Sequence, residues 1–305
     1  MWLLLAFLSA ALLGFYDVCK KKALSGNAVL PVLFLNTLIC SLLFLPFILI
    51  SSFTGVLDGT QFVVPAAGWA SHKYILLKSV IVLSSWTFGY FAMKNLPITI
   101  VGPVNATRPV MVLVGAMLVF GEQLNLCQWT GVLLAIVSFF LLSRSGKKEG
   151  VDFKHNRWVF FLVLAAVLGA ISGLYDKYLM APVENGGVGL SRMLVQSWYN
   201  LYQCVLMGIT MMLLWWPARH RSTPFKWRWS IILISVFLSI ADFVYFYVLS
   251  LPGAMISIVS MVRRGSVVVS FLCGAVVFHE KNLKAKFIDM LLVLLGMLFL
   301  YLGSR

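Results

Sequence analysis

The sequence predicts an all-α polytopic membrane protein with ten transmembrane helices, arranged as two inverted five-helix repeats. Three observations support this: the composition, a series of apolar stretches long enough to span a bilayer, and an internal repeat. Of the 305 residues, 61% are hydrophobic and only 11% are charged. A water-soluble domain of this length cannot bury so much apolar surface, so we expect the protein to reside in a lipid bilayer.

The apolar stretches predict the individual helices, because a helix needs roughly 20 apolar residues to cross the hydrocarbon core. The first stretch lacks a basic leader and a cleavage pattern, so we expect a retained helix. Most linkers are short, but those at 51–73, 144–157, 177–190 and 217–228 are longer. The predicted spans are 2–18, 28–50, 74–93, 98–119, 124–143, 158–176, 191–216, 229–250, 253–278 and 286–303.

An internal repeat organises these helices. "GFYD" at 14–17 recurs as "GLYD" at 173–176, and "YFAMKNLP" at 90–97 recurs as "YFYVLSLP" at 245–252. We therefore divide the chain into a first repeat (1–145), a basic linker (146–156) and a second repeat (157–305). An odd number of helices in each repeat makes the two run oppositely through the membrane, as in alternating-access transporters.

The charge distribution excludes some functions. The net charge is +14, but Lys and Arg cluster in the short polar stretches between apolar ones, which is typical of membrane proteins, so nucleic acid is not an expected partner. The expected partners are the bilayer and a small-molecule substrate, with the chain a monomer or homodimer. The five cysteines fall singly, and no catalytic or metal-binding motif occurs, so we expect no enzyme activity, no cofactor and no metal.

The end of each repeat carries a family resemblance. Both repeats close with a Phe-x-Glu turn before a last apolar helix, in "VFGEQLNLCQWTGVLLAIVSFFLL" and "VVFHEKNLKAKFIDMLLVLLGMLFLYLG". The chain thus resembles the EamA branch of the drug/metabolite transporter superfamily over nearly its whole length. This resemblance implies ten helices around a central cavity and a carrier of small metabolites in the cell inner membrane. It favours cytoplasmic termini, whereas the loop charges favour both termini outside, so the orientation stays open.

Arginines in the middle of predicted spans mark the candidate site. Arg108, Arg263 and Arg264 each cost roughly 2.5–3.5 kcal/mol at a helix centre, so they need acidic partners, a wet cavity or an anionic ligand. Asp242 is the one acid that we place at the same depth, and it cannot neutralise three guanidinium groups. Because guanidinium forks bind phosphate or carboxylate bidentately, we predict an anion site. The alternative is that the arginines are structural and pair with Asp242 or with backbone carbonyls to lock helices together.

The family resemblance refines this site. The triose-phosphate and nucleotide-sugar branch of the superfamily holds substrate phosphate with a basic pair on helix 9 and a basic residue on helix 4. Arg263, Arg264 and Arg108 look like those positions, although this chain has Arg where Lys is usual. Further polar or aromatic residues at helical spacing are expected to line the same site: Asn105, Ser260, Tyr245, Trp86, Tyr90, Gln196, Tyr199 and Asn200.

The aspartates have several interpretations. Asp242 either pairs with an arginine, carries a proton that couples transport to a gradient, or only packs between helices. Asp17 and Asp176 occupy equivalent places in the two repeats, near helix ends. They are either exposed ion pairs with neighbouring lysines or opposed gates, one at each membrane face.

The sequence therefore predicts a secondary transporter of a small polar metabolite, expected to be anionic, that works by alternating access. A first alternative is an exporter of amino acids or amphipathic metabolites. A second, from a different class, is a flippase for phosphate-linked lipids or an accessory membrane factor.

Overall fold

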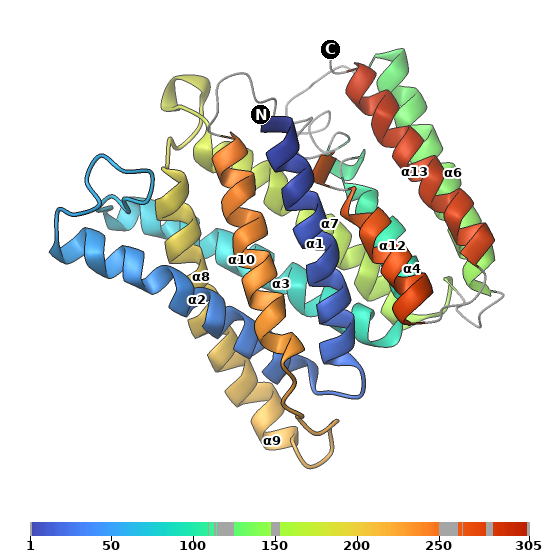
Figure 1. Ribbon diagram of the computed structural model, residues 1–305, viewed down its shortest axis with the longest axis horizontal. Coiled ribbons are helices and arrows are strands. Elements are labelled where there is room, and N and C mark those ends of the chain that lie inside the picture. Colours follow the sequence, from blue (N-terminus) through green and yellow to red (C-terminus); the bar gives the residue numbers. More distant parts are fainter. Residues whose placement is uncertain are drawn as a thin grey trace.

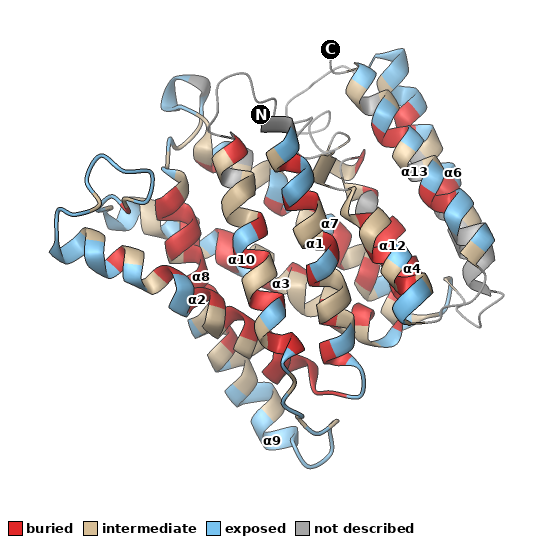
Figure 2. Cartoon of the chain, in the orientation of Figure 1, coloured by how far each residue is buried: buried red, intermediate tan, exposed pale blue. Residues whose placement is uncertain are grey.

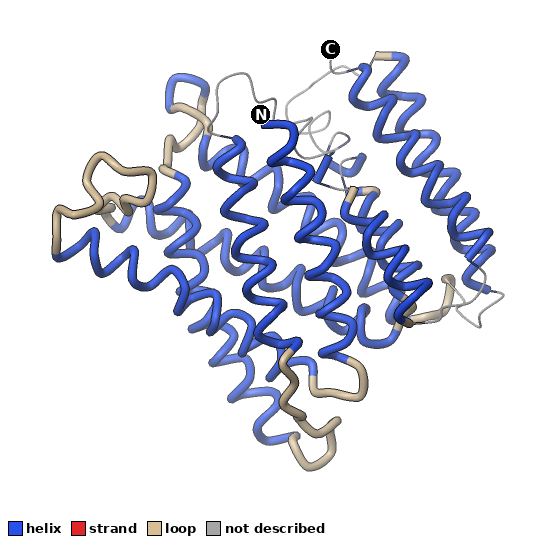
Figure 3. The backbone as a smooth tube through the Cα atoms, in the orientation of Figure 1, coloured by secondary structure: helices blue, strands red, loops and turns tan. Residues whose placement is uncertain are grey.

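A computed structural model describes residues 2–108, 110–112, 114, 125–147, 153–249, 262–263, 265–278 and 283–303. Within these ranges all regular secondary structure is helical (Figure 3). The predicted all-α class is therefore confirmed for the described part of the chain.

The helices follow the predicted order along the chain. In the first half they are α1 (Trp2–Leu24), α2 (Val29–Phe53), α3 (Trp69–Asn95), α4 (Ile98–Ala106) and α6 (Leu126–Lys147). In the second half they are α7 (Arg157–Met180), the 3-10 turn η1 (Val183–Asn185), α8 (Arg192–Thr210), the π-helical turn η2 (Met211–Trp215), α9 (Trp216–Ala218), α10 (Ser230–Leu249), α12 (Ser266–Val277) and α13 (Leu283–Gly303).

Several of these helices have the length and composition of membrane spans. Among the described residues, four are long and apolar enough to cross a bilayer: α2, α3, α7 and the continuous segment Arg192–Ala218. Shorter apolar helices occur at Leu126–Ser138, Ser230–Tyr245, Ser266–Val277 and Phe287–Gly303. The predicted spans 98–119 and 253–278 lie partly outside the described residues, so the count of ten crossings stays a prediction.

The helices are longer than the apolar stretches, and the predicted linkers are correspondingly shorter. We predicted a linker at 51–73, but α2 continues to Phe53 and α3 already begins at Trp69. Likewise α7 continues to Met180, into the linker predicted at 177–190. Hydropathy follows the hydrocarbon core, whereas backbone hydrogen bonding continues into the polar interface. The predicted boundaries were therefore wrong at the polar ends of these helices.

Helix packing is symmetric with respect to the two halves of the chain (Figure 1). α1 packs against α10, and their counterparts in the other half, α7 and α3, pack against each other. In the same way α3 contacts α8 as α10 contacts α2. Two more contacts join counterparts directly, α2 with α8 and α6 with α13, and α12 of the second half contacts both α1 and α4 of the first. The halves are thus interleaved, and the main helix contacts run between them.

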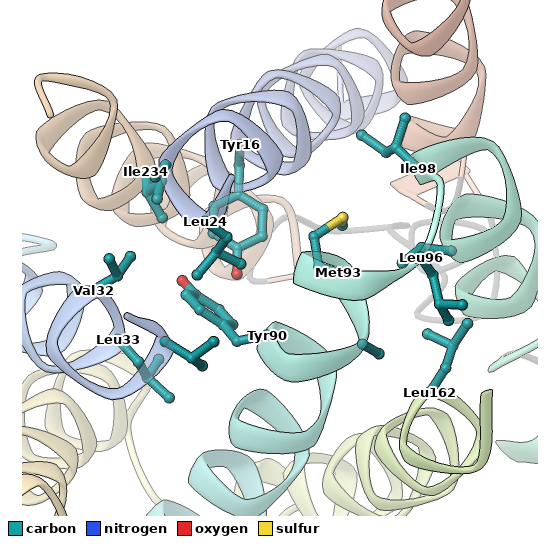
Figure 4. Close-up of a cluster of buried hydrophobic side chains, with 14 of the residues drawn as sticks. Tyr16, Leu24, Val32, Leu33, Tyr90, Met93, Leu96, Ile98, Leu162 and Ile234 are labelled. Carbon is teal, nitrogen blue, oxygen red and sulfur yellow. The ribbon is translucent and has the colours of Figure 1, made fainter. Parts of the chain in front are cut away.

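The core lies where these helices cross. Buried residues gather where the helices pack against one another, whereas many residues on the outside of the bundle are exposed (Figure 2). A central cluster includes Tyr90, Met93, Leu96, Ile98 and Leu162 (Figure 4). Large apolar residues such as Leu4, Phe140 and Leu213 lie on the exposed faces. Such a surface is unfavourable in water and suits contact with lipid.

The contact of α1 with α12 depends on Gly14. A Cβ atom at this position would lie 2.4 Å from Cβ of Val269. We expect Gly14→Ala to lower the melting temperature of the detergent-purified protein, because overpacking costs about 1–3 kcal/mol and outweighs the gain in helix propensity of up to about 1 kcal/mol. Gly89→Ala is the control, since its Cβ would make an ordinary contact of 3.6 Å with Ala165. Equal effects of the two substitutions would contradict the close approach at Gly14.

Candidate functional site

Seven charged side chains meet in the interior of the bundle, and we call them the interior charge cluster: Asp17, Lys20, Lys78, Arg108, Asp176, Asp242 and Arg263. They come from α1, α3, the helical residue 108 that follows α4, α7, α10 and the segment 262–263. Lysine is rarely this buried, yet the side chains of Lys20 and Lys78 are only 9% and 3% exposed. Charges at such depth require compensation, and they commonly mark transport pathways.

Arg263 and Asp242 form a hydrogen-bonded ion pair, with side chains that are 16% and 14% exposed. The Arg263 guanidinium also lies 4.2 Å from the ring centroid of Tyr245, in a cation–π contact. The hydroxyl of Tyr199 donates to Oδ2 of Asp242 at 3.4 Å. Of the interpretations that the sequence left open for Asp242, the structure contains the pairing with an arginine.

A second ion pair joins Lys78 of α3 to Asp176 of α7. The ammonium of Lys78 lies 5.0 Å from the ring centroid of Tyr199. Tyr199 therefore lies between the two ion pairs, with its ring toward Lys78 and its hydroxyl on Asp242. Lys78 was not among the predicted site residues, although it is the single charged residue between Tyr74 and Met93 and, like the arginines, is a charge in the middle of a predicted span.

The third pair is within α1, where Nζ of Lys20 lies 2.7 Å from Oδ1 of Asp17. The same ammonium lies 4.3 Å and 5.4 Å from the ring centroids of Tyr16 and Tyr90. The hydroxyls of these two tyrosines point toward one another (Figure 4). Because Lys20 and Lys78 are both buried, the alternative of exposed helix-end ion pairs was wrong for Asp17 and for Asp176.

Arg108 is held differently. Its Nη2 donates to the carbonyl oxygen of Ala165 in α7 at 3.5 Å, which is near the limit for a hydrogen bond, and its Nε is buried without a partner. Asp17 is within electrostatic range of Arg108 but forms its ion pair with Lys20. One turn before Arg108, Oδ1 of Asn105 is also buried without a partner. Arg108 is thus the member of the cluster whose charge no carboxylate contacts within the described residues.

The remaining predicted residues lie on the same helices or outside the described part. Gln196 and Asn200 are buried on α8, and the side-chain amide of Asn200 donates to the backbone carbonyl oxygen of Gln196 at 2.9 Å. Both polar atoms of the Gln196 side-chain amide are buried without a partner. Trp86 packs against the apolar core. Ser260 and Arg264 lie outside the described residues, so their place in the site stays a prediction.

The Lys78–Asp176 pair allows a test of burial. We expect Lys78→Met or Asp176→Asn alone to destabilise the protein by about 3–5 kcal/mol, because each leaves one charge buried without its partner. The double variant removes both charges and should recover most of this loss. The measurement is thermal unfolding in detergent. If the drop in melting temperature of the double variant equals the sum of the drops of the two single variants, the two side chains are not coupled.

Comparisons with known proteins agree with this architecture. Residues 1–144 match the family model of the EamA-like transporter family. A protein of Archaeoglobus fulgidus named only as an uncharacterized transporter is 23% identical over 194 residues, which is 63% of this chain; the chain spans 64% of that relative's length.

A solved crystal structure shares the fold, with a TM-score of 0.64 and 16% identity, covering 100% of this chain and 98% of that chain. The predicted resemblance is confirmed over residues 1–144, where the chain is similar to the EamA-like transporter family. Four of the described helices have the length and composition of membrane spans, as a multi-pass membrane protein requires.

Proposed function

We propose that this protein is a secondary transporter of a small anionic metabolite, phosphorylated or carboxylated, that resides in the cell inner membrane. The observation behind this proposal is Arg108, a guanidinium in the interior whose contacts are a long hydrogen bond to Ala165 and the electrostatic influence of Asp17. A phosphate or carboxylate would fill its unused donors bidentately, and each such bond would be charge-assisted.

The charges of the cluster support an anionic substrate. Lys20, Lys78, Arg108 and Arg263 carry four positive charges, whereas Asp17, Asp176 and Asp242 carry three negative ones. Among the described members of the cluster one positive charge is therefore left over, in surroundings where an uncompensated charge is costly. A bound monoanion would neutralise the cluster. An anion with a second charged group would compete with Asp242 for Arg263 and be gripped by two arginines, with Arg264 a third candidate.

The cycle that we propose is alternating access of two inverted five-helix repeats, 1–145 and 157–305, joined by the linker 146–156. The exchange symmetry of helix packing supports such repeats. Asp17 and Asp176 occupy equivalent positions in them, and each is paired with a buried lysine. We assign these pairs as opposed gates that open alternately. Release of Asp242 from Arg263 would accompany substrate binding, and proton uptake by the freed carboxylate would couple the cycle to a proton gradient.

Neutral groups complete the proposed site. Asn105, Ser260 and Tyr245 would supply hydrogen bonds to the anion, and Gln196 has buried amide atoms available for the rest of the substrate. Tyr199, Asn200, Trp86 and Tyr90 would form its walls. Transporters of this family are generally not enzymes, and the proposal needs neither a cofactor nor nucleic acid. The protein would work as a monomer or a homodimer.

Anion binding is the first test. We expect inorganic phosphate, sugar phosphates or dicarboxylates to raise the melting temperature of the detergent-purified protein. Arg108→Ala should weaken this binding at least about tenfold, the size of losing one hydrogen bond to a charged group. Arg157→Ala is the matched control, because Arg157 is exposed at the start of α7 and stacks on Trp158. Stabilisation by amino acids alone, or by phospholipids alone, would replace the proposal with one of the two alternatives.

Competition between Asp242 and the substrate gives a second prediction, in which a substitution is expected to strengthen anion binding rather than weaken it. Asp242→Asn removes the carboxylate that occupies Arg263, so a dicarboxylate should bind several-fold more tightly to this variant than to the wild type. Arg263→Ala should bind it more weakly than the wild type does. Binding is measured by isothermal calorimetry in detergent. Weaker binding to both variants would mean that Arg263 and Asp242 serve only to hold the helices together.

A further inference from the structure

The backbone of α7 approaches the Arg108 guanidinium most closely at Gly169. A Cβ atom at this position would lie 2.7 Å from Cζ and Nη1 of Arg108 and 3.0 Å from Nε. Real Cβ atoms essentially never show contacts under 3.0 Å. The guanidinium therefore occupies the space that any side chain at position 169 would need, and it lies there only because position 169 has none.

Gly169 belongs to a row of small residues on one face of α7. Ala165, Gly169 and Gly173 are spaced four residues apart, which places them on the same side of the helix and allows other elements to approach closely. The Ala165 carbonyl oxygen accepts the hydrogen bond from Arg108 at 3.5 Å and another from Oγ of Ser85 at 2.7 Å. Arg108 thus rests on the α7 backbone next to a carbonyl that is itself fixed to α3.

We propose that Gly169 is a positioning residue for the substrate anion. By lacking a side chain it lets the guanidinium of Arg108 lie against α7, hydrogen-bonded to Ala165, with the remaining N–H groups available to the anion. The inference rests on the proposed function, because it assigns Gly169 to the Arg108 anion site. The sequence repeat drew attention to the neighbouring Gly173 of "GLYD" instead.

The same contact joins the two halves of the chain. Arg108 belongs to the first half and α7 is the first helix of the second, so the position of the guanidinium depends on how α4 and α7 pack. The guanidinium is the far end of a flexible side chain and can move away from a Cβ atom at position 169, but bidentate geometry toward an oxyanion depends on where this planar group lies. A methyl group at position 169 would push the guanidinium off the helix and break its hydrogen bond to Ala165.

The test is Gly169→Ala, with inorganic phosphate and succinate as probes and their affinities measured by thermal shift and calorimetry. We expect the affinity for the anion that the wild type binds to fall at least about tenfold, because the main guanidinium contact is misplaced. Weakening of the helix would not account for such a loss, since alanine is a better helix former than glycine. Gly173→Ala, one turn further along, is the matched control. Its Cβ would lie 3.8 Å from Cγ2 of Val112, so anion affinity should be unchanged.

A double-mutant cycle separates positioning from a structural role. If Gly169 acts through Arg108, then Gly169→Ala has no further effect on anion affinity when Arg108 is already alanine, and any change that it causes in the melting temperature disappears in that background. An equal loss of stability in both backgrounds, or wild-type anion affinity in Gly169→Ala, would overturn the inference while leaving the anion transporter intact. If neither anion binds to the wild type, or if Arg108→Ala binds them equally well, the proposed function fails and the positioning role fails with it.

Discussion

A charge buried inside a membrane protein needs compensation, and for six of the seven members of the interior charge cluster an opposite charge supplies it, which constrains how the helices of this protein are arranged. Lys78 and Asp176 lie 98 positions apart in the sequence, on α3 and α7, and their pairing ties the first half of the chain to the second. Arg263 and Asp242 tie the segment 262–263 to α10 in the same way. Hydrophobic burial cannot select these neighbours, because lipid is as apolar as leucine. Specific polar contacts therefore decide which helix faces which.

The fold could be predicted from the sequence as far as single helices are concerned. Apolar stretches placed helices near the observed positions because each helix must cover the hydrocarbon on its own. The partners of α1 and α3 could not be read in this way, since a stretch that is hydrophobic all round has no face that indicates a neighbour. The repeat of "GFYD" and "GLYD" indicated two related halves, but only coordinates reveal that α1 packs against α10 and α3 against α7.

The candidate site could be predicted from the sequence where a charged residue lies in an otherwise apolar span. Arg108, Arg263 and Asp242 stand out because a charge in a span is expensive wherever it points. Gly169 carries no chemistry, so its role follows only from the guanidinium lying above it. For Asp176, one of the two alternatives was an ion pair with a neighbouring lysine, because sequence proximity was the available guide, whereas the fold brings Lys78 to it from another helix.

The arrangement of the pairs also bears on selectivity. Three of the cluster's cations have carboxylate partners, so a neutral solute that enters meets groups whose charges are already satisfied. Displacing Asp242 from Arg263 requires a ligand that brings its own negative charge, since otherwise two buried charges are separated without compensation. Tyr199 contacts Asp242 with its hydroxyl and lies beside Lys78 with its ring, so a change at one ion pair alters the surroundings of the other. In the proposed cycle, a substrate anion that loosens the first pair would therefore perturb the second, and this would couple substrate binding to the movement of the proposed gates.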